Sequence, residues 1–161
     1  IAIANATRTA ARTGSTAGKA PTADFQILSS LSAALGSVKN ATVNYVVIYK
    51  VTGSTNAVPA ACTSAAAIAA HGNAANFCNT YSAADLSAIL ANPVSAQTSY
   101  GGSCAGAGKD TKWCPTTRVV DQGATNGPDY LGVAISLTVP TFTRLVGSGL
   151  PMSRRHRRPS T

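Results

Sequence analysis

The chain has 161 residues, of which 45% are hydrophobic, 6% aromatic and only 11% charged. This length suits one domain with a core of its own, but soluble globular proteins usually carry about 25% charged residues. Glutamate is absent from the sequence, and Ser, Thr, Asn and Gly are abundant. The composition therefore disfavours a cytosolic enzyme and is typical of a protein that works outside the cell.

The net charge of +8 suggests nucleic-acid binding, but much of it is concentrated at one end of the chain. A basic segment of this kind is either a solvated, disordered end or a site for phosphate, anionic lipid or cell-wall polymer. We expect a disordered end, and nucleic acid is not an expected partner. The segment contains Arg154, Arg155, Arg157 and Arg158.

Four cysteines form an even set, which indicates either disulfides or a metal site. The two short-range pairings are Cys62 with Cys78 and Cys104 with Cys114, although other connectivities are possible. A zinc site would need CxxC-type spacing or interleaved histidines, and His71 is the only histidine nearby. We therefore expect disulfides in an oxidising compartment, and neither a metal nor another cofactor.

The sequence has no stretch of 18 apolar residues that would span a membrane. It shows no secretion signal, and it begins at Ile1 instead of methionine. We expect an export or anchoring segment upstream of Ile1.

The first expected element is a helix from Ile1 to about Arg12, ended by Gly14. Small residues recur on one of its faces, which lets another helix come close. This face either packs against other subunits, which we favour, or belongs to an ordinary alanine-rich helix. It consists of Ile3, Thr7, Ala10, Ala11 and Gly14.

A second helix is expected to begin at Thr22 or Asp24 and to end at Gly36, with one narrow apolar stripe. Residues 40–52 are rich in β-branched and aromatic side chains and predict a long inner strand. In the composite segment 61–91, Ser82 is the expected N-cap of a short helix.

Residues 95–115 are rich in glycine and serine and predict an irregular region. Residues 116–121 and 130–142 predict the two strands of a hairpin. The predicted fold class is α+β, with an N-terminal helix and a second helix packed on a small antiparallel sheet, and with an irregular region pinned by disulfides.

Sequence motifs for catalysis are incomplete. In CAGAGKDT, Asp110 stands where a P-loop needs Ser or Thr, and Ser103 stands where it needs glycine. GxSxG is absent, and only His71 and His156 could serve as a general base. The five aspartates are scattered near turns. The sequence predicts no catalytic residues and a protein that is not an enzyme.

Five segments together resemble bacterial TadE-like proteins, minor pseudopilins of tight-adherence (Flp-type) pilus systems. The resemblance covers about Ala6 to Gly147. It implies that residues 1–14 are the lower end of a longer anchoring and assembly helix, that 15–147 form an extracytoplasmic α+β head, and that 148–161 form a basic tail. The segments are ATRTAARTGS, ADFQILSSLSAAL, VVIYKVTGSTNAVPAAC, FCNTY and GPDYLGVAI.

The family implies a structural subunit of a bacterial surface pilus or secretion-type assembly, which acts by contacts with other subunits. Its expected partners are other pilin or pseudopilin subunits, including copies of itself in a filament, and the membrane through a segment upstream of Ile1. Two alternatives stay open, a secreted binding module for an anionic surface polymer and a structural protein of another filament or virion. The expected location is extracytoplasmic, at the cell surface or secreted.

Overall fold

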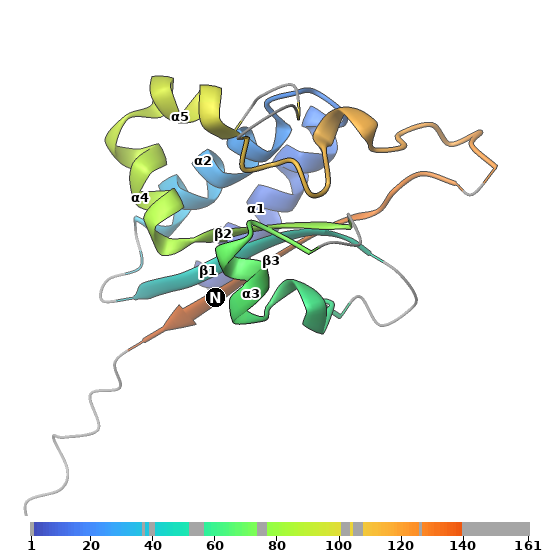
Figure 1. Ribbon diagram of the computed structural model, residues 1–161. Helices are drawn as coiled ribbons and strands as arrows, with labels where there is room; N and C mark the ends of the chain where they lie inside the picture. Colours follow the sequence, from blue (N-terminus) through green and yellow to red (C-terminus); the bar gives the residue numbers. More distant parts are fainter. Residues whose placement is uncertain are drawn as a thin grey trace, which may run out of the picture.

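The computed structural model describes residues 2–36, 38, 41–51, 57–73, 77–100, 104, 108–125 and 127–139. Helices pack on a three-stranded antiparallel sheet, so the expected α+β fold class is confirmed (Figure 1). The helices are α1 (Ala2–Ala17), α2 (Ala23–Leu35), α3 (Ala65–Ala69), α4 (Ala83–Ala91) and α5 (Pro93–Tyr100). The strands are β1 (Thr42–Lys50), β2 (Cys78–Ser82) and β3 (Leu131–Thr138), and short 3-10 turns occupy Ala60–Cys62 and Pro115–Thr117.

Strand β1 is the central strand, as its sequence predicts, and the order in the sheet is β2-β1-β3. Its two faces are buried against different clusters. Val46 and Ile48 join the main core formed with α1, α2, α4 and α5, whereas Val47 packs on the other face with the Cys62–Cys78 disulfide. A strand that is apolar on both faces is thereby covered on both faces.

The predicted hairpin between 116–121 and 130–142 is wrong. Strand β3 pairs with β1, and Pro115–Thr117 forms a 3-10 turn instead of the start of a strand. The central position of β1 explains this outcome, because only β1 offers β3 a long apolar partner. Val119 still contacts Asp129, which directly precedes the second segment. The Asp129 backbone N–H donates to the Val119 carbonyl oxygen over 2.7 Å, and the Val119 backbone N–H donates to Asp129 Oδ2 over 3.0 Å.

Helix α1 does not end at Gly14 but continues to Ala17, and Gly18, with φ +55°, follows as the left-handed residue. Gly14 is buried inside the helix. A Cβ atom at Gly14 would lie only 2.8 Å from Cδ1 of Ile27 in α2, so glycine allows the two helices to approach. Helix α1 is thus packed onto the head, and residue 14 does not mark a structural border.

None of the helices in the described ranges is long and apolar enough to cross a membrane.

Candidate functional site

A buried polar cluster centred on Asp24 binds the segment 110–118 to α2 and β2. The Asp24 carboxylate accepts hydrogen bonds from Asn79 Nδ2 (2.7 Å), Tyr81 Oη (2.7 Å) and Arg118 Nη2 (2.6 Å). All four side chains are buried. Burial and the adjacent Asp24 charge raise the pKa of Tyr81 well above its ordinary value, so its hydroxyl stays a donor.

The local structure explains how these groups meet. Asn79 and Tyr81 are two residues apart on β2 and therefore point to the same face, where the first turn of α2 presents Asp24. The backbone of Trp113 also binds Asn79. Its backbone N–H donates to Asn79 Oδ1 (2.7 Å), and its backbone carbonyl oxygen accepts from Asn79 Nδ2 (2.9 Å). The Arg118 guanidinium lies over the Trp113 ring, 4.2 Å from its centroid.

Asp110 lies beside this cluster and is also completely buried. Within the part of the chain that the structure describes, neither of its carboxylate oxygens has a hydrogen-bond partner. Burial is the main cause that raises the pKa of Asp110 to about 6, and the negative charge of Asp24 adds to it. The protonation of Asp110 therefore changes within a mildly acidic range.

A second polar cluster surrounds Asp85 at the start of α4. The carboxylate accepts from the Ser82 backbone N–H (2.7 Å), the Ser82 hydroxyl (2.8 Å), the Tyr100 hydroxyl (2.7 Å) and the Lys109 ammonium group. Ser82 caps the helix in return, which confirms its predicted role. Burial alone would raise the pKa of Asp85, but these hydrogen bonds outweigh burial and lower it. His71 Nδ1 lies 3.6 Å from Asp85 Oδ2.

These two clusters act chemically as fixed internal cross-links. Each carboxylate accepts from several donors at once, and burial together with Asp85 raises the pKa of Tyr100 to about 12. Both carboxylates are buried and hydrogen-bonded, whereas Nε and Nη1 of Arg118 have no hydrogen-bond partner among the described residues. Such networks hold loops in one geometry and keep the two carboxylates away from solvent. In the described ranges, no three His, Cys, Asp or Glu side chains come together as a metal ion would need.

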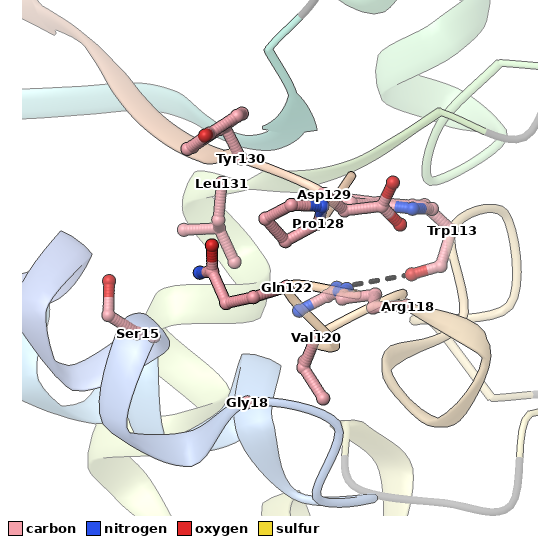
Figure 2. Close-up of a pocket in the computed structure, with 11 residues that line it drawn as sticks. Ser15, Gly18, Trp113, Arg118, Val120, Gln122, Pro128, Asp129, Tyr130 and Leu131 are labelled. Atoms are coloured by element: carbon pink, nitrogen blue, oxygen red, sulfur yellow. Dashed lines mark hydrogen bonds between the residues drawn. The ribbon is translucent and has the colours of Figure 1, made fainter. Parts of the chain in front are cut away.

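A small cavity of about 290 Å³ lies between the end of α1 and the segment that leads into β3. Figure 2 shows Ser15 of α1 and Gly18, which follows α1, on one side and the paired Arg118 and Trp113 on the other. Ligand pockets usually measure about 300–1,000 Å³, so this cavity is at the small end. Its carboxylate, Asp129, is already bound to Lys50 at 2.5 Å and to the Val119 backbone N–H at 3.0 Å.

Both predicted disulfides are present. Cys62–Cys78 joins the first 3-10 turn to β2, and Cys104–Cys114 closes the loop that carries Lys109 and Asp110. All four cysteines are paired, and the bonds indicate an oxidising, extracytoplasmic environment.

The predicted assembly face of α1 divides into two parts. Ala10 and Gly14 are buried in the core of this chain, so their predicted contact with another subunit is wrong. They face inward because β3 and α2 need a small-residue surface for close packing. Ile3, Thr7 and Ala11 are half-buried at the margin of that contact. The basic residues Arg154, Arg155, Arg157 and Arg158 lie outside the described residues.

Several residues that define the site were not identified from the sequence. The sequence pattern indicates Asp24 only as a candidate helix cap, and Arg118 lies in the segment 116–121, for which the pattern predicts a strand. The two residues are too far apart in sequence for spacing to relate them. Comparison with known proteins adds no relative, because no family model, curated protein or solved structure matches this chain.

Proposed function

We propose that this protein is a structural subunit, similar to TadE-like minor pseudopilins, of a bacterial surface pilus or secretion-type assembly. It acts by contacts with other subunits and not by catalysis. The observation that carries this proposal is the position of α1, which is fixed to the head along one side and exposed along the other. Arg8 and Arg12 lie on the exposed side.

The exposed side of α1 is suited to burial against another protein. Three hydroxyl groups on or beside this side have partners within the helix, since Thr13, Ser15 and Thr16 each donate to the carbonyl oxygen four residues earlier, over 3.1 Å. A hydroxyl with an internal partner costs little when it loses water. This side is therefore polar in composition but can pack closely against a neighbouring helix.

The rest of the head supports the proposal through its rigidity. The Asp24 and Asp85 clusters bind the irregular segment 108–118 to the core, and the disulfides add two covalent links. A subunit that bears load outside the cell benefits from such internal cross-links, because its loops keep one geometry under oxidising conditions.

The proposal is tested by reversing the charge of the exposed helix face. Arg8→Glu with Arg12→Glu in the full chain should reduce incorporation into the surface assembly of the producing bacterium. The unfolding free energy should change by less than about 0.5 kcal/mol, because both side chains are exposed. The matched control is Arg8→Lys with Arg12→Lys. Normal incorporation of the reversed variant would contradict the proposal.

A further inference from the structure

One side of the β3 backbone has no partner strand in the described sheet. The Lys50 N–H of β1 donates to Phe77 on the β2 side, whereas the Val51 N–H donates to Tyr130 on the β3 side. Backbone groups alternate along a strand. Odd-numbered residues of this part of β1 therefore face β3, where Tyr49 is paired with Gly132.

The same alternation fixes the outward groups of β3. Its even-numbered residues bond to β1, so its odd-numbered residues direct their N–H and C=O groups away from the sheet. The register shift of the β1–β3 pair occurs on β1, between Val43 and Tyr45, and leaves the alternation along β3 intact. The outward groups belong to Leu131, Val133, Ile135 and Leu137.

The other edge of the sheet is protected, whereas no strand of the described residues pairs with the outer side of β3. On the outer side of β2, the Thr80 N–H donates to the His71 carbonyl oxygen over 3.2 Å, and Gly72 forms a bridge with Asn79. Natural edge strands usually carry charges, proline or bulges that prevent pairing with another chain. Strand β3, LGVAISLT, contains none of these.

A groove follows the beginning of the β3 edge. It has a volume of about 670 Å³ and extends around the strand from the α1 side to the opposite face of the sheet. Tyr130 at its end is 67% exposed. The groove is lined by Ala11, Tyr49, Val51, Tyr130, Leu131, Gly132 and Val133.

We propose that β3 pairs with β3 of a second copy of this chain, antiparallel and about a two-fold axis. This arrangement joins the two sheets into one, with order β2-β1-β3-β3-β1-β2. An isologous contact satisfies both open edges at once. With Ile135 of the two copies opposite each other, Leu131 lies opposite Val139, which is 50% exposed in the single chain.

The β3 edge can accept a second copy without bringing like charges together. Two copies of a chain with net charge +8 repel each other, but β3 itself carries no charge. The charged groups near its beginning, Lys50 and Asp129, neutralise each other at 2.5 Å. A two-residue hairpin turn directly after β3 is disfavoured, because Pro140 does not fit the positive φ of such turns.

The expected contact is weak in isolation. The surface buried by pairing along one strand and a short groove is at the low end of the range for specific interfaces, which begins at about 1,200 Å² in total. We therefore expect a dissociation constant of about 1–100 µM. The inference does not depend on the proposed function, because a secreted module of another kind would have the same open edge.

The first test places a charge on β3 of the full chain. Ser136 lies on β3, and its hydroxyl accepts from Asn44 Nδ2 at an exposed position. In the proposed register the two Ser136 side chains are diagonal neighbours, about 7–8 Å apart. Ser136→Lys and Ser136→Glu should each weaken dimerisation about tenfold or more, measured by sedimentation equilibrium. An equimolar mixture of both variants should form the heterodimer again, and Ser136→Thr should behave as the wild type.

The second test removes a backbone donor. The Leu137 N–H points away from β1, so Leu137→Pro removes no hydrogen bond of the sheet but prevents pairing at this position. It should weaken dimerisation about as much as the charged variants, whereas Leu137→Thr, which keeps the N–H, should weaken it less. A wild-type chain that stays monomeric at about 1 mM would overturn the inference, including the case in which another segment of the same chain covers the β3 edge. Charged or proline variants that dimerise as the wild type, or a mixture that stays monomeric, would also overturn it.

Discussion

Arg118 and Asp24 are 94 residues apart in the sequence and form a buried ion pair, with 2.6 Å between Nη2 and Oδ1. The side chains are 3% and 0% exposed. The pair also binds Asn79 and Tyr81 through the shared carboxylate. It therefore joins α2, β2 and the loop after the second disulfide at one point.

The first prediction is that removing one charge of this pair destabilises the head strongly. Asp24→Asn leaves the Arg118 guanidinium buried without its counter-charge, and such a change typically costs about 3–5 kcal/mol. Chemical denaturation of the wild type, both single variants and the double variant Asp24→Asn with Arg118→Gln measures the coupling. A loss below about 1 kcal/mol in Asp24→Asn would show that the pair is not a structural cross-link.

The second prediction concerns pH and Asp110. The folded state holds the Asp110 proton up to about pH 6, whereas the unfolded chain releases it near the ordinary pKa of 3.8. The folded state therefore binds more protons in this window, and stability falls as the pH rises from about 4 to about 6. Above that window the contribution of Asp110 is constant.

Asp110→Asn should remove this dependence. The unfolding free energy of the variant minus that of the wild type should be about 1–3 kcal/mol larger at pH 7 than at pH 4, because one pKa unit corresponds to about 1.4 kcal/mol. Asp85 has the opposite effect on stability, and at lower pH. Because the pKa of Asp85 is lowered in the folded state, Asp85 stabilises the fold at pH values above its ordinary pKa, and this contribution is lost as the pH falls. Thermal unfolding of both proteins from pH 4 to 8 measures the difference. A constant difference across this range would show that Asp110 does not titrate there.

The third prediction follows from the inward position of Ala10. Ala10 is 0% exposed, so Ala10→Leu overpacks the contact of α1 with the core and should cost about 1–3 kcal/mol. Ala4→Leu is the matched control, because Ala4 is exposed on the same helix. Urea unfolding measures both variants. Equal stability of the two would mean that the inner face of α1 is not part of the core.

The fourth prediction concerns the Cys62–Cys78 disulfide, which ties β2 to the chain 16 residues earlier. Replacing both cysteines by alanine should lower the unfolding free energy by about 3 kcal/mol, the value expected for a loop of this length. Mass spectrometry of the unreduced wild type should show both disulfide-linked peptide pairs. Four free thiols in protein from the native compartment would contradict the extracytoplasmic location.

The sequence predicts the elements whose patterns are long and local. Helix α2, the inner strand β1, the Ser82 cap and both cysteine pairings follow from periodicity, capping residues and short spacing, and all are confirmed. Each of these depends on residues near one another in the chain. Local signals are therefore sufficient for this part of the fold.

The remaining features depend on tertiary contacts. Strand β2 is short and polar, so no local pattern indicates it. It forms a strand because it pairs with β1. Gly14 looks like a helix end but lies within α1, because Ile27 and Leu131 need the space that its missing side chain leaves. The Asp24 cluster joins residues from distant segments, so its members could not be identified from spacing.

The central claim is that the exposed side of α1 contacts other subunits. The most direct measurement is site-specific photocrosslinking in living cells of the producing bacterium, with a photoreactive amino acid at Arg12 and a control at Ala61, an exposed position in the first 3-10 turn. The account predicts covalent adducts with other subunits of the assembly from position 12 and few from position 61. Folded protein that gives no adduct at position 12, or equal adducts at both positions, would contradict it.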